Sequence, residues 1–265
     1  MKNNNEHRAR KRFGQNFLQD RSIIDQIAQS TTTSRNNTLV EIGPGTGALT
    51  EVLLSNTSEL HVIELDRDLV ALLQEKFADR ENLHIHSADA LKFDFSTLPQ
   101  TGQQQKITVV GNLPYNISTP LLFHLFNYLD IIDTLVLMLQ KEVVDRITSP
   151  PGQKSRGRLG VMSQYYCSTE KLLDAPPESF SPSPKVMSAV VRLTPHQIPV
   201  RASNENLFAK IVRAAFAQRR KTLRNNLKDV IDAAAMETVD IDFSRRAETL
   251  SVEEFVELSN QLDAD

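Results

Sequence analysis

The chain has 265 residues, of which 40% are hydrophobic and 24% charged, a composition typical of one or two folded domains with a sizeable core. A single cysteine, Cys167, excludes an internal disulfide, and no apolar run approaches the ~20 residues that cross a membrane. The N-terminus is polar and basic and carries no secretory signal, so we expect a cytoplasmic protein without a membrane partner.

The net charge of -3 conceals two basic segments. Residues 1–21 carry six Lys or Arg against two acids, and residues 205–228 carry seven against one. The tail from 229 to 265 carries eleven acids against two arginines and dominates the total. This distribution indicates a polyanionic partner at defined surfaces, although a run of charge is more often only a solvated face.

Residues 1–20 resemble a basic arm followed by a lid. The segment Arg8–Leu18 combines basic side chains with two phenylalanines, a glycine and amides. Asp20 is a suitable N-cap for a short amphipathic helix. The buried face of that helix is expected to consist of Ile23, Ile24, Ile27 and Ala28.

A strand, a glycine turn and a helix start follow one another between residues 38 and 54. Thr38–Ile42 is typical of a buried strand and leads into Gly43-Pro44-Gly45-Thr46-Gly47, after which Ala48–Leu54 is helical. Glycines permit close backbone approach, and a helix N-terminus offers free N–H groups. The pattern predicts a cradle for a nucleoside cofactor, although its G-x-G-x-G spacing differs from that of dinucleotide folds.

Two acids follow the next two predicted strands. Leu60–Glu64 ends in Glu64, which is placed to accept hydrogen bonds from both ribose hydroxyls of an adenosine, with Asp66 as the alternative. Asp89 follows the strand Leu83–His86. It could accept the exocyclic amine of a bound adenine, or it could simply cap a surface turn.

We expect no metal site. His84 and His86 share one face of their strand, but no Cys, Asp or Glu around them has the spacing of metal ligands. Cys167 belongs to no nucleophile motif and is expected in the core.

The strand Ile107–Gly111 delivers Asn112-Leu113-Pro114-Tyr115 to the same edge of the sheet. The Asn112 side chain and the Leu113 carbonyl, turned outward because Pro114 disfavours a helical residue before it, are two acceptors suited to an adenine amine. Tyr115 can stack on the base. The alternative is an ordinary proline turn with a buried tyrosine.

The following elements complete an open α/β sheet. The pattern predicts helices over Thr119–Tyr128, from Lys141 to Ile147 and over Leu159–Tyr166, with strands over Thr134–Gln140, Leu172-Leu173 and Val186–Leu193. The loop 149–158 is expected to be mobile and to grip phosphates through Arg156 and Arg158. Prolines around Phe180 would hold its ring in a fixed position. The ring would then either stack on the target base as a second aromatic surface or fill space in the core.

The chain is predicted to divide into domains 1–197 and 198–265, because residues 194–203 resemble a linker and everything beyond them is helical. If residues 206–228 formed one helix, six basic residues would share a face. A break near Gln218 would spread these residues over different faces. The basic face could also be an ordinary solvated surface. Ser251 and Glu254 form a capping box for a final helix. The six basic residues are Lys210, Arg213, Arg220, Lys221, Arg224 and Lys228.

Five motifs occur in one order along the chain: Gln15-Asn16-Phe17-Leu18, Glu41-Ile42-Gly43-Pro44-Gly45-Thr46-Gly47, Asn112-Leu113-Pro114-Tyr115, Phe180-Ser181-Pro182-Ser183-Pro184-Lys185-Val186 and Gln218-Arg219-Arg220-Lys221-Thr222-Leu223-Arg224. Over nearly its whole length the chain resembles the small-subunit (16S) ribosomal RNA adenine N6,N6-dimethyltransferases of the kasugamycin-sensitivity type. The resemblance implies a Rossmann-like seven-strand class I methyltransferase sheet with a small all-helical C-terminal domain.

The resemblance also implies a reaction and its residues. S-adenosyl-L-methionine would donate methyl groups to N6 of two adjacent adenosines near the 3′ end of 16S ribosomal RNA, leaving S-adenosyl-L-homocysteine, within a partly assembled small subunit. Cofactor contacts would fall on Asn16, Leu18, Gly43, Glu64, Asp89 and Asn112, and target-base contacts on Asn112, Leu113, Tyr115 and Phe180. For RNA we expect Arg10, Lys11, Arg12, Arg156, Arg158, Arg220, Lys221 and Arg224, and we expect a monomer.

Two positions depart from the family pattern, namely Arg156, where Tyr is common, and Met187, where Asp is common. A related large-subunit methyltransferase that confers macrolide resistance is one rival, disfavoured by the Phe180 segment and the run Gln218–Arg224. A non-catalytic RNA-binding factor with the same fold is another, disfavoured by the acids at 64 and 89 and by Asn112. Transfer is expected to be direct, driven by positioning and by acceptors matched to the amine.

Overall fold

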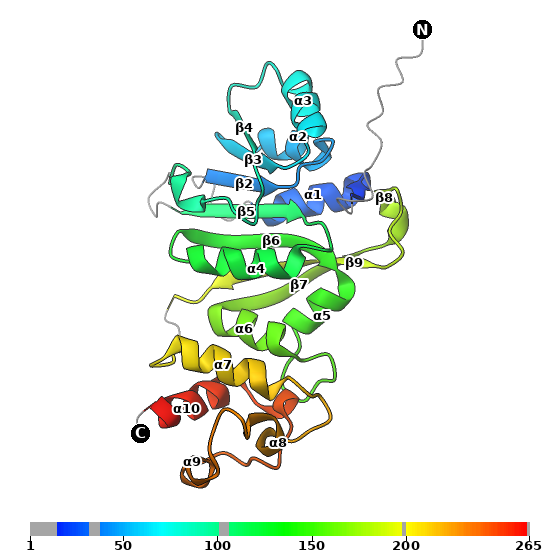
Figure 1. Ribbon diagram of the computed structural model, residues 1–265. Coiled ribbons are helices and arrows are strands. Elements are labelled where there is room, and N and C mark those ends of the chain that lie inside the picture. Colours follow the sequence, from blue (N-terminus) through cyan, green and yellow to red (C-terminus); the bar gives the residue numbers. More distant parts are fainter. Residues whose placement is uncertain (1–14, 32–37, 101–105, 198–199, 264–265) are drawn as a thin grey trace. The chain divides into compact units, whose positions relative to one another are not determined.

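The computed structural model describes residues 15–31, 38–100, 106–197 and 200–263. Seven strands form one sheet in the order β4-β3-β2-β5-β6-β9-β7 (Figure 1). Their bounds are β2 Thr38–Ile42, β3 Leu60–Glu64, β4 Leu83–Ser87, β5 Ile107–Asn112, β6 Ile132–Gln140, β7 Cys167–Ala175 and β9 Ser188–Pro195. The predicted seven-strand sheet is confirmed. Six strands lie within two residues of their expected bounds, and β7 is longer than the expected strand Leu172-Leu173.

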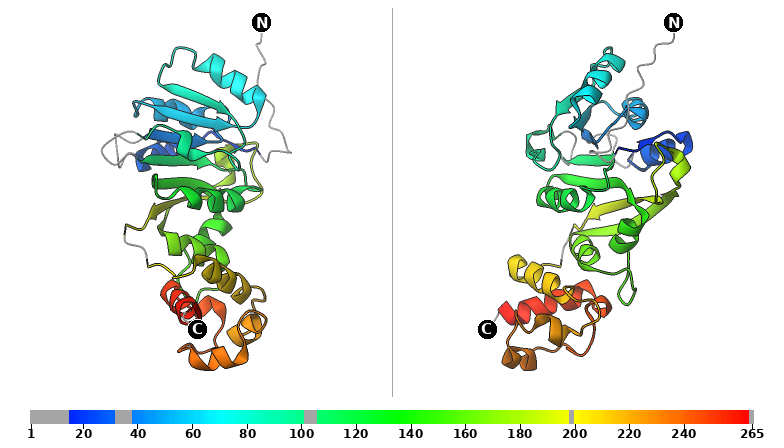
Figure 2. Two further views of the ribbon diagram at one scale, coloured as in Figure 1. Left: turned by 60° about the vertical axis from the view of Figure 1, so that its left-hand side comes forward. Right: turned by 45° about the vertical axis from the view of Figure 1, so that its right-hand side comes forward.

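The strands from β4 to β6 are parallel, and β9 joins β6 antiparallel. Parallel strands require crossover connections, which explains why helices separate them along the chain. The helices and turns of this part are α1 Arg21–Ser30, α2 Ala48–Leu54, α3 Arg67–Lys76, η2 Phe95–Thr97, α4 Ser118–Leu125, η3 Phe126–Tyr128 and α5 Lys141–Ile147. Two further views show α1, in dark blue, and α4, in green, on opposite sides of the sheet (Figure 2).

Helix α1 begins as the sequence predicts. The Asp20 carboxylate accepts hydrogen bonds from the backbone N–H groups of Ser22 and Ile23, so it is the N-cap. The four expected apolar residues are buried and join a cluster with α2 and the facing sides of β2 and β3. Their burial anchors the segment that carries Asn16 and Leu18 to the sheet.

A short pairing that sequence reasoning did not predict ties two distant segments together. Strand β1, Phe17–Leu18, pairs antiparallel with β8, Phe180–Ser181, which follows the turn η4, Pro177–Ser179. The backbone N–H of Gln19 also donates to the Ser179 carbonyl, at 2.8 Å. Both partners are two residues long, too short for a sequence pattern to reveal them.

Contacts divide the chain into two compact units, one of Met1–Val144 and Glu170–Pro195, the other of Asp145–Thr169 and His196–Asp265. The second unit is helical, with α6 Arg158–Tyr166, α7 Glu205–Ala215, α8 Leu223–Leu227, α9 Ala233–Thr238, η5 Ala247–Thr249 and α10 Val252–Asp263. Its first segment, 145–169, belongs to the stretch that the sequence analysis assigned to the first domain. The second border, at Pro195, lies near the expected boundary at 197.

The break considered near Gln218 is the alternative observed, because α7 ends at Ala215 and α8 begins at Leu223. The Asn226 side-chain amide donates to the carbonyls of Ala215 and Gln218, which satisfies acceptors at the end of α7. At the start of α10 the predicted capping box is confirmed, since Ser251 and Glu254 exchange backbone-to-side-chain hydrogen bonds. No helix among the described residues is both long and apolar enough to span a membrane.

Candidate functional site

The carboxyl ends of β2, β3 and β5 surround one open pocket within the sheet unit. All six residues expected to contact the cofactor line it, as do Leu113 and Tyr115 of the expected base site. These six are Asn16, Leu18, Gly43, Glu64, Asp89 and Asn112. Asn16 and Asn112, 96 positions apart in the chain, therefore meet at the edge where ligands bind in open α/β sheets.

The floor of the pocket is the glycine turn after β2. Gly45 has φ +58°, a left-handed conformation that side chains rarely adopt, and a Cβ there would lie 2.8 Å from the Phe17 ring. The turn therefore requires glycine both for its backbone and for the close approach of Phe17. It leads directly into α2, whose first residues Ala48 and Leu49 also line the pocket.

Glu64 closes the end of β3 and is buried, although it lines the pocket. Its two carboxylate oxygens accept hydrogen bonds from the backbone N–H groups of Asp66, at 2.9 Å, and Gly45, at 3.4 Å. Burial raises the pKa of Glu64 above its ordinary value, against the effect of these donors. The carboxylate is thus fixed in position with lone pairs left for further donors.

The two other candidate acids, Asp66 and Asp89, each accept a hydrogen bond from a nearby backbone N–H group. Asp66 is buried, caps α3 through the N–H of Asp68, and accepts a hydrogen bond from Gln15, so it is occupied as a structural cap. Asp89 lines the pocket and also accepts the N–H of Leu91 at 3.0 Å. The capping interpretation is therefore the one observed, and the contact of Asp89 with an adenine amine stays a prediction that its place in the pocket wall permits.

Asn112 is the last residue of β5, and its side chain is held in one orientation. Its Nδ2 donates to the backbone carbonyl of Asn16 at 2.9 Å. Because the amide nitrogen is engaged, Oδ1 is the end of the carboxamide that remains as an acceptor. An acceptor at the carboxyl end of the central strand is the group that binding an amine requires.

Leu113 and Tyr115 complete this wall. The Leu113 N–H donates to Met138 at 3.1 Å, and within the described part of the chain no donor reaches the Leu113 carbonyl. The Tyr115 hydroxyl bonds Ser188 Oγ, at the start of β9, at 2.7 Å. Burial raises the pKa of Tyr115, so the phenol remains neutral and its half-buried ring is fixed at the pocket edge.

A second buried carboxyl, Glu41, also lines the pocket. Burial raises the pKa of Glu41 to about 8, aided by the nearby Glu64, although the Thr50 hydroxyl donates to it at 2.6 Å. At neutral pH this group therefore holds a proton. In the sequence, only the position of Glu41 just before the glycine turn distinguished it. A residue of a buried strand would otherwise be expected to be apolar.

The structure corrects the expected placement of Phe180. Its side chain is 4% exposed, packs in the apolar cluster, and stands opposite Leu18 in the β1–β8 pair, so it does not line the pocket. The core alternative is the one observed, because apolar neighbours on both segments cover the ring. Met187, one of the two departures from the family pattern, is exposed, and its carbonyl accepts the N–H of Lys141.

The expected RNA contact at Arg156 is also corrected. Arg156 is 2% exposed, and its guanidinium donates to the carbonyls of Ser149 and Leu250 and to Gln164 Oε1. These bonds hold the loop 149–157 and the start of α10 together inside the helical unit. A side chain so enclosed cannot contact a phosphate, so Arg156 does not contribute to the cationic surface of the loop.

The other basic candidates in the helical unit are exposed. Arg158 begins α6, and Arg220 and Lys221 lie in the turn between α7 and α8. Arg224 is exposed as well, but it bonds Glu237 at 3.1 Å. The neighbouring Arg219 donates to the Lys154 carbonyl, so this turn lies against the basic loop. Arg10, Lys11 and Arg12 lie outside the described residues.

Sequence reasoning missed two residues that shape the site. Gly111 precedes Asn112, and a Cβ there would lie 2.4 Å from the Ile42 carbonyl of the neighbouring strand. Ser188 is buried and fixes Tyr115. A glycine inside an apolar strand signals close backbone approach and could have identified the first, whereas nothing local marks the second.

The model of one protein family, described as ribosomal RNA adenine dimethylase, matches residues 6–264. Two similar relatives are named ribosomal RNA small subunit methyltransferase A. The one from Saccharophagus degradans is 53% identical, covering 99% of each chain. The one from Pseudomonas putida is 52% identical, covering 97% of this chain and 96% of the relative.

Two solved structures share the fold. A dimethyladenosine transferase from Plasmodium falciparum superposes with a TM-score of 0.79 at 24% identity, covering 94% of this chain and 98% of its own. The 23S rRNA methyltransferase ErmE superposes with a TM-score of 0.73 at 25% identity, covering 94% and 100%. The match in both cases extends over the sheet and the helices that follow it.

Proposed function

The chain belongs to the ribosomal RNA adenine dimethylase family, and from that premise we propose that it methylates N6 of two adjacent adenosines near the 3′ end of 16S ribosomal RNA. The proposed methyl donor is S-adenosyl-L-methionine, which supplies an electrophilic methyl group when bound. The observation that carries the proposal is the fixed carboxamide of Asn112 at the wall of a pocket that also holds Glu64 and Asp89.

The residues of the pocket fit a nucleoside cofactor. Glu64 offers anchored carboxylate oxygens to ribose hydroxyls, and the turn Gly43–Gly47 lets the backbone approach closely. Asp89 lies just past the end of β4 and lines the same pocket as Glu64, so it could accept a hydrogen bond from an adenine amine. Asn16 and Leu18 line the remaining side from the β1 segment.

The target base is proposed to bind against Asn112, Leu113 and Tyr115. An adenine amine is a weak nucleophile because its lone pair is delocalised into the ring. Two acceptors, Asn112 Oδ1 and the Leu113 carbonyl, would hold its hydrogens and favour a pyramidal nitrogen as positive charge develops. The ring of Tyr115, steadied by Ser188, would stack on the base. This chain therefore acts by positioning, and no covalent enzyme intermediate is required.

The acceptor RNA must present an unpaired adenine, because the amine has to leave its helix to enter the pocket. That requirement favours single-stranded RNA within a partly assembled small subunit. The identities of 53% and 52% to small-subunit methyltransferases, against 25% to the large-subunit enzyme, support the choice of subunit. The buried position of Phe180 removes one of the sequence arguments for that choice.

The decisive experiment is single-turnover methylation of small subunits isolated from a strain that lacks the modification. Asn112→Ala should lower methyl transfer on the order of 10²-fold or more, as expected for loss of one preorganised group at a reacting centre. Asn127→Ala is the matched control, since Asn127 is exposed and bonds only within its own helical turn. Transfer by Asn112→Ala at the parental rate would make the turn merely structural.

A further inference from the structure

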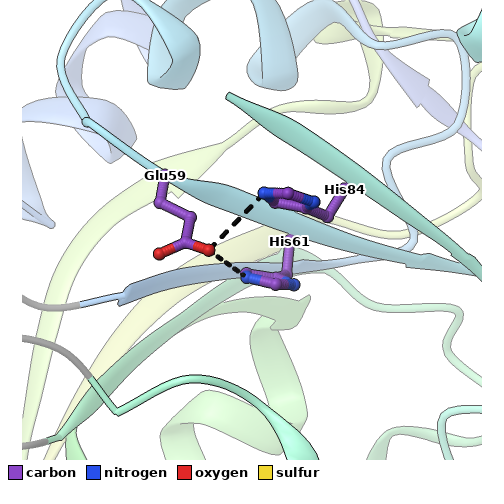
Figure 3. Close-up of side chains that lie close together, drawn as sticks. All are labelled: Glu59, His61 and His84. Atoms are coloured by element: carbon purple, nitrogen blue, oxygen red, sulfur yellow. Dashed lines mark hydrogen bonds and ion pairs between the residues drawn. The ribbon is translucent and has the colours of Figure 1, made fainter. Parts of the chain in front are cut away.

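A second cluster of ligand-type side chains lies near the amino ends of β3 and β4, away from the pocket. It consists of Glu59, just before β3, His61 on β3 and His84 on β4 (Figure 3). One Glu59 oxygen lies 3.2 Å from His61 Nε2 and 3.5 Å from His84 Nε2. All three ligand atoms lie within 4.8 Å of one another.

We propose that Glu59, His61 and His84 bind a divalent transition metal of the zinc class. Zinc bonds to imidazole nitrogen and carboxylate oxygen at about 2.0 to 2.2 Å, so ligand atoms of a tetrahedral site lie roughly 3.3 to 3.5 Å apart. The two distances to Glu59 match that separation. Water would complete the coordination, and two nitrogens with one oxygen suit zinc better than the oxygen-seeking magnesium or calcium.

The backbone holds the three ligands in place. His61 and His84 are register partners in the parallel β3–β4 pair, and their rings stack with centroids 4.6 Å apart. The turn before Glu59 is fixed by Asn82, whose side chain donates to the Thr57 carbonyl at 3.2 Å. A site built on paired strands needs little rearrangement to accept a metal.

A partner on the far side of His61 can set its tautomer. His61 Nδ1 lies 2.9 Å from His86 Nε2. When Nδ1 donates its proton to His86, the lone pair of Nε2 faces Glu59 and is free to coordinate. Metal-bound histidines usually have such a partner on the second nitrogen, which orients the ring and makes it a better ligand.

The cluster can be reached from solvent. The side chains of His84 and Glu59 are 46% and 27% exposed, which leaves a path from solvent.

The expectation of no metal arose because the spacing of His84 and His86 alone has no third ligand. The register that places His61 beside His84 is set by tertiary pairing. Strand β4 is an edge of the sheet, so a metal there would fasten it to β3. Glu64 lies three residues after His61, about 10 Å away at ~3.3 Å per residue, and Asp89 lies farther along, past the end of β4, so the metal's role would be structural.

Calorimetric titration of Zn²⁺ into metal-stripped, untagged protein tests the proposal. We expect one site per chain, with binding weakened more than tenfold in His84→Ala and in Glu59→Gln. His86→Ala should weaken it about 10- to 100-fold, as for other residues that orient a metal ligand. His196→Ala is the control, because His196 is exposed and bonds Gln164 in the helical unit.

Thermal unfolding gives a second readout independent of RNA methylation. Zn²⁺ should raise the Tm of the wild type and of His196→Ala, but not that of His84→Ala, whose side chain is exposed enough for the variant to fold. Absence of Zn²⁺ binding to the wild type, or equal affinity in all four variants, would overturn the proposal. The cluster would then be a hydrogen-bonded network in which His61 Nε2–H donates to Glu59.

Discussion

The side-chain amide of Asn112 donates a hydrogen bond, 2.9 Å long, to the backbone carbonyl of Asn16, 96 residues earlier in the chain. This bond joins the end of the central strand β5 to the segment just before β1. It leaves Asn112 Oδ1 as the acceptor and places Asn16 at the pocket wall. The position of the first segment and the orientation of the candidate catalytic carboxamide therefore depend on each other.

Replacing Glu64 should weaken cofactor binding. In Glu64→Ala the ribose loses a charge-assisted acceptor, which should reduce the binding free energy by roughly 1.5 to 3 kcal/mol in a calorimetric titration with S-adenosyl-L-methionine. Glu64→Gln retains one side-chain oxygen as an acceptor, so its affinity for the cofactor should lie between those of the wild type and Glu64→Ala. Unchanged affinity in both variants would return the ribose role to Asp66, which the structure shows occupied as the cap of α3.

Glu41 should make the protein less stable as the pH rises. Burial raises its pKa in the folded state to about 8, whereas the unfolded chain has the ordinary value of 4.5. Between these two pKa values the folded state keeps a proton that the unfolded state releases. The stabilisation that protonated Glu41 gives the folded state is therefore complete below pH 4.5 and is lost as the pH rises through 8.

Glu41→Gln removes that titration and keeps an acceptor for the Thr50 hydroxyl. The free energy of unfolding, measured in urea, should depend less on pH in this variant than in the wild type. Above pH 8 the variant should be the more stable of the two. Glu75→Gln, on the exposed side of α3, should leave the profile as it is. A wild-type stability that does not change across this range would contradict the prediction.

Gly111→Ala should destabilise the sheet beside the active turn. The added Cβ would lie 2.4 Å from the Ile42 carbonyl of β2, which is paired on both sides and cannot move aside easily. Such overpacking typically costs about 1 to 3 kcal/mol, measurable by urea unfolding. Gly157→Ala should be close to neutral, because a Cβ there meets nothing within 4 Å. Equal stabilities would mean that β2 and β5 can separate freely.

Local patterns were enough to predict the strands, the glycine turn and both helix caps. Buried strands and helices leave periodic apolar residues, and Asp20, Ser251 and Glu254 act on residues within three positions of themselves. Motif resemblance supplied Asn16 and Leu18, which no periodicity marks. These parts of the fold and of the pocket depend on short-range chemistry that the sequence displays directly.

Long-range pairing could not be predicted in this way. The burial of Phe180 depends on its two-residue pairing with Leu18, and the burial of Arg156 depends on carbonyls as distant as that of Leu250. An arginine among glycines and serines resembles a surface residue until its acceptors are known. The break near Gln218 was considered from the sequence, but the hydrogen bond from Asn226 to the Ala215 carbonyl, eleven residues earlier, was not.

RNA binding and chemistry should separate in two sets of variants, because the basic turn after α7 and the Asn112 turn act on different steps. Arg220→Ala with Lys221→Ala removes two exposed cations. Small-subunit binding should weaken, and the slope of log affinity against log salt should fall by up to about 1.4 to 1.8, since each phosphate contact contributes roughly 0.7 to 0.9. Methylation at saturating subunit should survive.

Filter binding across a salt series, together with single-turnover methylation, measures both quantities. Asn112→Ala should show the reverse pattern, with affinity and salt slope near the wild type and methyl transfer lost. Arg224→Ala is an informative comparison, because its guanidinium already bonds Glu237 and its removal should change the slope less than removal of Arg220. If the double variant kept the wild-type salt slope, the turn would be a solvated surface, and the RNA contacts would have to lie on other basic residues.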